Sequence, residues 1–157
     1  METDQRVSRL QRFLRLSSAT RRLLLAGGLV VFFVRILLWV LSFKRLVWLV
    51  ERTALRSARL APVHLAEEKN RDIAWAVTTA ARYVLRSRCL TQALAAQWLF
   101  AWFGRPTLLR IGVAKADDEA LVAHAWLESD GCVILGEEAL EAEEYAVLPL
   151  PSPWTRS

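Results

Sequence analysis

Hydrophobic residues recur at helical spacing through most of the first two thirds of the chain. Each stretch ends at a signal that stops a helix, which is a proline, a polar break or a glycine. The third stretch is apolar on most of its sides, and this predicts a helix at the centre of the core. The predicted helices cover residues 43–61, 67–85 and 89–103.

The pattern changes after Pro106, where short runs alternate as strands do. Asp130-Gly131 predicts a tight hairpin between the second and third runs. Residues 137–144, with five glutamates, predict a solvated turn or a short helix. Helices followed by an antiparallel meander predict an α+β fold. The predicted strands cover residues 107–114, 121–128 and 132–135.

A long apolar run occupies residues 23–43, interrupted by Arg35, Ser42 and the pair Gly27 and Gly28. Its 21 residues have the length that a membrane-spanning helix requires. The single arginine costs about 2.5–3.5 kcal/mol at the centre of a span, which such a segment tolerates. The same pattern fits a helix packed on the protein or lying at an anionic membrane surface, and we favour these two over a span. Without a small-residue cleavage site, the run predicts membrane association of a cytoplasmic protein rather than secretion.

Charge is distributed unevenly along the chain. Residues 1–60 carry 12 Lys and Arg against 3 Asp and Glu, whereas residues 61–157 carry 9 against 13. The net charge of +5 therefore comes from the N-terminal part, where four arginines recur at every third position. Because the rest of the chain carries more acidic than basic residues, we expect no nucleic-acid partner. With Pro62 as the boundary, the predicted organisation is a basic and hydrophobic helical arm (1–61), a domain (62–150) and a tail (151–157). The four arginines are Arg6, Arg9, Arg12 and Arg15.

Two residues have a setting suited to nucleophilic chemistry. Cys89 starts a predicted helix beside Arg88, and the unpaired N–H groups and the dipole of a helix N-terminus favour a thiolate. His124 lies on a predicted strand and shares a face with Val122 and Trp126. If the Cys89 helix packs on that face, the two side chains meet. The alternative is a buried structural cysteine and a hydrogen-bonded histidine.

The remaining residues that bear reactive groups give no further site. The cysteines and histidines form no CxxC or HxxxH spacing, and no glycine-rich phosphate loop occurs, so we expect neither a metal nor a nucleotide cofactor. Cys132 and His64 are interpreted as structural.

Several blocks of sequence appear in the order found in one known family. The chain resembles the transglutaminase-like leader peptidases of lasso-peptide biosynthesis, the B proteins in their short split form. The resemblance covers residues 82–148, and residues 35–46 also look like the N-terminal region of that family. The blocks are Arg88-Cys89-Leu90-Thr91-Gln92, Gly104-Arg105-Pro106, Leu109-Arg110-Ile111-Gly112-Val113 and Ala123-His124-Ala125-Trp126-Leu127-Glu128.

The resemblance implies a papain-like or transglutaminase-like fold, with a central cysteine-bearing helix packed on a small antiparallel sheet. It implies that Cys89 attacks a peptide carbonyl and that His124 transfers the proton, without a cofactor. The substrate class it implies is a lasso precursor peptide, cut between leader and core. A separate leader-recognition protein and an asparagine-synthetase-like lasso cyclase are the implied partners.

The sequence departs from the family at the third catalytic position. Members show an aspartate about a dozen residues beyond the histidine, and here that position is Gly136, followed by Glu137. Glu137 is the predicted orienting carboxylate, with a plain surface glutamate as the alternative. The departure keeps open an inactive scaffold at the membrane, and the same Cys-His pair also fits an acyltransferase.

Overall fold

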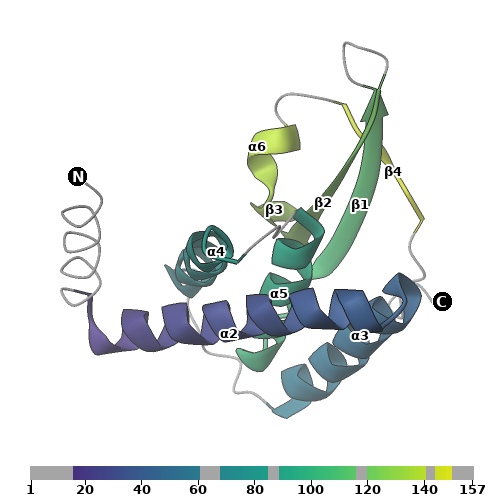
Figure 1. Cartoon of the computed structure of the whole chain (residues 1–157). Helices are drawn as coiled ribbons and strands as arrows, with labels where there is room; N and C mark the ends of the chain where they lie inside the picture. The colour runs from purple at the N-terminus through teal and green to yellow at the C-terminus, as the bar shows by residue number, and fades with distance from the viewer. Residues whose placement is uncertain (1–15, 61–67, 85–88, 116–119, 141–143, 150–157) are drawn as a thin grey trace.

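The computed structural model of the chain describes residues 16–60, 68–84, 89–115, 120–140 and 144–149. The α+β class predicted from the sequence is confirmed, with helices first and an antiparallel sheet after them (Figure 1). The elements are α2 (Ser18–Val40), α3 (Phe43–Leu60), α4 (Glu68–Ala81), α5 (Cys89–Trp102), β1 (Leu108–Lys115), β2 (Leu121–Ser129), β3 (Cys132–Leu135), α6 (Glu137–Leu140) and β4 (Ala146–Val147).

Some predictions concern residues outside the described ranges. These are the arginine stripe before residue 16, the boundary at Pro62, His64, Arg88 and the tail after residue 150. The division into arm, domain and tail therefore stays a prediction.

Helix α5 is the centre of the molecule, as its apolar sequence predicted. It is contacted by α2, α3 and α4 on one side and by β1 and β2 on the other (Figure 1). Leu94 and Phe100 are completely buried, and alanines at other buried positions let the neighbouring elements approach closely. Those alanines are Ala93, Ala95, Ala96 and Ala101.

The two helices of the N-terminal region belong to the same hydrophobic core. α2 buries Gly27, Val31 and Val34, and α3 contributes Leu46 and Val50. A Cβ at Gly27 would lie 3.4 Å from main-chain atoms of Ala76 in α4, an ordinary contact distance, so α2 and α4 pack closely at this position. Leu41, between the two helices, has an extended backbone (φ −103°, ψ 146°). α2 and α3 are therefore separate helices joined by a short bend.

The strands form one antiparallel sheet in the order β3-β2-β1-β4. Asp130 (φ 52°) and Gly131 (φ 79°) form the tight turn between β2 and β3, which confirms the predicted Asp-Gly hairpin, since both positions of such a turn need positive φ. Residues 137–140 form a short helix, one of the two predicted options. β4 was not predicted, because two residues are too few to show a strand pattern.

Glu51 of α3 provides a test of this packing. Burial removes water from its carboxylate and raises its pKa from 4.5 to about 7. The folded state therefore holds this proton more tightly than the unfolded chain, and stability falls as the pH rises from about 4.5 to about 7. We expect Glu51→Gln to match the wild type near pH 4 and to exceed it near pH 8 by about 1 kcal/mol, since a half-buried group bears only part of the full cost.

Urea unfolding between about pH 4 and pH 8 measures this difference. The same change at Glu138, an exposed glutamate, is the matched control and should leave the profile unaltered. A pH-independent difference between Glu51→Gln and the wild type would contradict the prediction.

Candidate active site

Cys89 is the first residue of α5 and is a free, half-buried thiol. The first N–H groups of any helix have no partner inside that helix, and together with the helix dipole they favour negative charge beside them. The burial of α5 fixes the position of the sulfur, because the rest of the helix cannot shift without disrupting the core.

His124 lies on β2 directly opposite Gly112 of β1, and an aromatic cluster surrounds its ring. The indole of Trp126 stacks on it, with centroids 6.3 Å apart and planes inclined by 12°, and the Tyr145 ring lies 5.7 Å away. A Cβ at Gly112 would come within 2.8 Å of Tyr145 Cβ and 3.0 Å of the Trp126 ring. Gly112 therefore leaves the space that Trp126 and Tyr145 occupy.

A polar chain holds Trp126 in place. Its Nε1–H donates to Glu128 Oε1 at 2.9 Å, and Glu128 Oε2 accepts from Arg110 Nε at 3.0 Å. Because Trp126 stacks on His124, the Arg110–Glu128 pair supports the imidazole indirectly. Arg110, Trp126 and Glu128 all come from the blocks that carry the resemblance.

The imidazole is oriented by a main-chain group. His124 Nε2 lies 3.0 Å from the carbonyl oxygen of Gly136. A carbonyl oxygen only accepts, so this hydrogen bond places the proton on Nε2 and leaves the lone pair on Nδ1. The Nδ1 atom is then the base able to take a proton from a thiol. At this position the family resemblance implies an aspartate, and here the main-chain carbonyl of Gly136 is the acceptor instead.

Gly136 is tightly constrained at this position. Its φ of 93° lies in the region that L side chains rarely adopt. A Cβ there would lie 2.9 Å from Trp126 Cβ and 3.1 Å from His124 Nε2. Both the backbone angle and the available space therefore require glycine.

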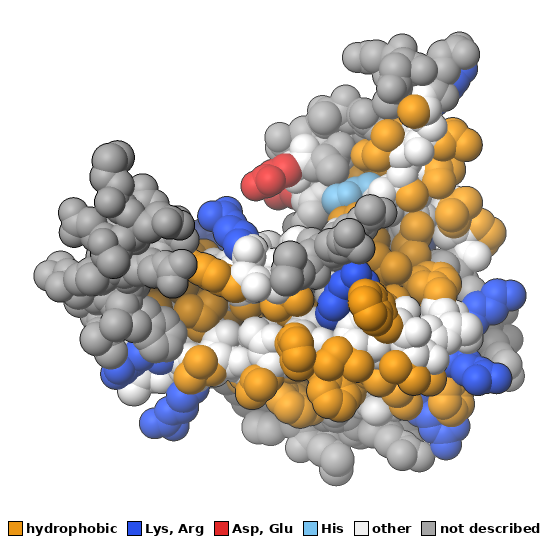
Figure 2. Space-filling view, in the orientation of Figure 1, with side chains coloured by type: hydrophobic (Ala, Val, Ile, Leu, Met, Phe, Trp, Pro, Cys, Tyr) orange, Lys and Arg blue, Asp and Glu red, His pale blue; other side chains and the backbone are white. Residues whose placement is uncertain are grey.

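Cys89 and His124 line the same open pocket, whose volume is about 410 Å³. Figure 2 shows the imidazole at the surface beside acidic side chains. Four elements form the walls: α4, α5, β2 and the segment from β3 into α6. The face of β2 that joins α5 in the hydrophobic core is the one with Ala125 and Leu127, not the predicted face with His124 and Trp126. Cys89 and His124 nevertheless line the same pocket.

Glu137, the third predicted site residue, also lines this pocket, but its side chain is exposed. The hydrogen bond described at His124 Nε2 goes to the preceding carbonyl, so a catalytic role of Glu137 stays a prediction. Trp75, Thr78 and Gln92 line the pocket as well. No sequence pattern marks Trp75 and Thr78 as site residues, and Gln92, one turn after Cys89, has the pattern of a packing residue.

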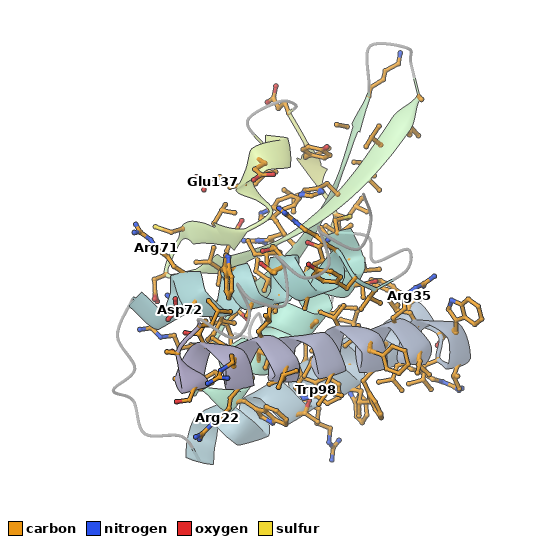
Figure 3. All side chains as sticks on the ribbon, turned by 60° about the vertical axis from the view of Figure 1, so that its left-hand side comes forward. Arg22, Arg35, Arg71, Asp72, Trp98 and Glu137 are labelled. Atoms are coloured by element: carbon orange, nitrogen blue, oxygen red, sulfur yellow. The ribbon has the colours of Figure 1, made fainter. Side chains whose placement is uncertain are left out.

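A second hollow of about 790 Å³ adjoins the first. The two share Ala74, Ile134 and Glu137, and they run between α4 and β3, which is an edge strand of the sheet. Arg71 lies on this side of the molecule with Glu137 (Figure 3). Among the described residues, no group of three or more His, Cys, Asp or Glu side chains is placed to hold a metal ion.

Comparison with known proteins agrees with this geometry. The model of the transglutaminase-like superfamily matches residues 31–149, and the chain belongs to this superfamily. The match begins inside α2 and includes both Cys89 and His124. No curated protein and no solved structure matches the chain. The transglutaminase-like fold commonly carries cysteine protease or acyltransferase activity.

Two glycines with positive φ allow the crowding at the site to be tested. A Cβ at Gly131 would meet nothing within 4 Å, whereas a Cβ at Gly136 would meet Trp126 and His124. We expect Gly131→Ala to lower the free energy of unfolding by about 1 kcal/mol through backbone strain alone. Gly136→Ala adds a steric clash, and we expect it to cost about 2–3 kcal/mol or more.

Urea unfolding measures both variants. We also expect Gly136→Ala, but not Gly131→Ala, to slow the reaction of Cys89 with iodoacetamide, because a displaced imidazole no longer takes the thiol proton. Equal effects of the two substitutions would mean that the Gly136 carbonyl has no special relation to His124.

Proposed function

We propose that the protein is a cysteine peptidase that removes the leader from a ribosomally made lasso-peptide precursor. The observation that carries the proposal is the presence of Cys89 and His124 in one pocket, with His124 Nε2 bonded to the Gly136 carbonyl. This leaves a proton acceptor and a nucleophile facing a common space, as a Cys-His acyl-transfer site needs.

The proposed reaction begins when His124 Nδ1 takes the Cys89 proton and the sulfur attacks the carbonyl carbon of the scissile bond. The oxyanion that forms accepts from main-chain N–H groups at the start of α5. The imidazolium then protonates the departing core amine, and the leader remains as a thioester on Cys89. A water deprotonated by His124 attacks the thioester, which releases the leader as a carboxylic acid and restores the thiol.

The shape of the cleft supports a peptide substrate. The catalytic pocket and the hollow beside it run along β3, which is an end strand of the sheet in the part of the chain that the structure describes. Extended peptides commonly bind along such an edge through main-chain hydrogen bonds. The second hollow also offers polar side chains to a peptide, namely Asn70, Arg71, Arg105, Ser129 and Asp130.

The lasso precursor is proposed on the sequence blocks around Cys89 and His124, which resemble those of split lasso leader peptidases. In that setting a separate protein recognises the leader, and an asparagine-synthetase-like cyclase uses the freed core amine to close the ring. Both partners are part of the proposal, and we place the reaction in the cytoplasm.

Two alternatives use the same residues. In an acyltransferase an amine, rather than water, resolves the thioester on Cys89, and members of the fold commonly have this activity. In an inactive scaffold the pair performs no chemistry. The Gly136 carbonyl is the argument for the inactive scaffold, because a neutral acceptor stabilises an imidazolium less than a carboxylate does.

Removal of the sulfur tests the peptidase. We expect Cys89→Ala to abolish cleavage of the precursor, because the acyl intermediate forms on its sulfur. Cys132→Ala, at the exposed cysteine on β3, keeps the main chain of the proposed peptide-binding edge, and we expect it to retain cleavage with at most a change in KM. Mass spectrometry of a precursor incubated with the protein and its recognition partner measures the products. A leader ending in a free acid supports hydrolysis, and a leader joined to an added amine identifies an acyltransferase.

Thiol labelling separates an active site from a scaffold without any substrate. Cys132 is exposed and Cys89 is half-buried, so access alone favours Cys132. Faster alkylation of Cys89 therefore requires activation of its sulfur. A Cys89→Ala protein that still cleaves, or a Cys89 that reacts more slowly than Cys132, would remove the peptidase assignment.

The predicted role of Glu137 has its own test. Its carboxylate lines the pocket and is exposed to water, which screens its field at an imidazolium, so we expect Glu137→Gln to lower kcat/KM only by a factor of about three to ten. Glu138→Gln, the same change at the next residue of the rim, is the control and should have a smaller effect. The pH profile of kcat/KM measures whether the Glu137 variant alters the titration of the catalytic pair.

A further inference from the structure

The outer face of α2 carries a stripe of seven large, exposed hydrophobic side chains. Leu29, Trp39 and Val40 are 70–77% exposed. At 100° per residue, all seven positions fall within an arc of about 120°, opposite the buried Gly27, Val31 and Val34. Figure 2 shows hydrophobic side chains along α2. The stripe consists of Leu25, Leu29, Phe32, Phe33, Ile36, Trp39 and Val40.

Basic side chains lie at both ends of this stripe. Arg21 and Arg22 precede it on α2, and Lys44 and Arg45 follow it at the start of α3 (Figure 2). Residues 16–53 contain one carboxylate, Glu51. Positive charge around an apolar face complements an anionic lipid surface.

Two exposed tryptophans, Trp39 of the stripe and Trp48 of α3, have the surroundings of interfacial residues. The Arg35 guanidinium lies 5.6 Å from the Trp39 ring centroid, and that of Arg52 lies 4.9 Å from the Trp48 centroid. Each pair holds a cation at the level of an exposed indole, and tryptophan and arginine settle together at the depth of the lipid headgroups.

The packing of α2 decides between a helix that crosses a membrane and one that lies parallel to its surface. α2 is long and apolar enough to cross a bilayer, but its inner face packs along α4 and α5. A crossing helix would carry Arg71 and Asp72 of α4 into the hydrocarbon, at a large cost in free energy. A helix lying in the membrane plane buries the stripe and leaves these charges in water.

We propose that the protein docks on an anionic membrane surface through the stripe on α2, with the helix parallel to the membrane. The pocket with Cys89 and His124 lies beyond α4 and α5, on the side that carries the sheet, so it stays open to water. A second copy is the weaker candidate, because two antiparallel α2 helices would bring Arg21 and Arg22 of each copy near Lys44 and Arg45 of the other.

Sedimentation of the full chain with phosphatidylcholine vesicles, with and without phosphatidylglycerol, tests this proposal. We expect binding to the anionic vesicles, about tenfold weaker binding to neutral ones, and a loss of similar size at about 1 M salt. The triple variant Leu29→Gln, Phe33→Gln and Trp39→Gln should bind at least about tenfold more weakly. Trp102→Gln, Leu121→Gln and Val147→Gln together, exposed residues of α5, β2 and β4, form the matched control and should bind like the wild type.

Each other result has a definite meaning. Circular dichroism first establishes that both triple variants are folded. Equal binding by the α2 variant, or no preference for anionic vesicles, would overturn the proposal. Protein that stays in the membrane after alkaline carbonate extraction would identify a span instead of a surface helix. If the wild type binds no vesicles but forms a dimer that the α2 variant does not form, the stripe is the interface with a second copy. If the α2 variant loses only its binding to the leader-recognition protein, the stripe is the contact with that partner. No readout requires peptidase activity, so the proposed function is tested separately.

Discussion

The burial of α5 between a layer of helices and the sheet is the constraint on which the other features depend. A helix without a polar face must be covered on all sides, and α2, α3, α4 and the sheet together provide that cover. Its interior positions are then fixed by packing, while its first residue, Cys89, lies at the edge of the core beside the pocket. A buried helix thus presents a reactive group at its N-terminal end.

The histidine is positioned by different means from the cysteine. His124 lies on a strand, stacked against Trp126 and bonded to the carbonyl of Gly136. A main-chain carbonyl fixes the tautomer and the direction of the ring as well as a carboxylate does, but it provides no negative charge for the imidazolium. The site therefore keeps the orientation that an acid would give and loses part of its electrostatic effect.

The two sides of the molecule offer different surfaces. The sheet side carries polar hollows along the edge strand β3, suited to an extended peptide. The helical side carries an apolar stripe with basic ends and contains a single carboxylate between residues 16 and 53. Because α5 and α4 separate the two, contact through one surface leaves the other accessible.

The sequence alone determined the α+β class, the Asp130-Gly131 hairpin and the central place of α5, because periodicity, turn residues and apolar composition act locally. It also singled out Cys89 and His124 through their positions on a helix and a strand. Only the tertiary structure decided that the Gly136 carbonyl orients His124, since every residue has a carbonyl and no residue type marks the one that is used. In the same way, the run at residues 23–43 favoured burial or an interface over a span but did not decide among them. The contacts of α2 with α4 and α5 were needed to divide that run into a buried face and an exposed one, because which side of a uniformly apolar helix is covered depends on its neighbours.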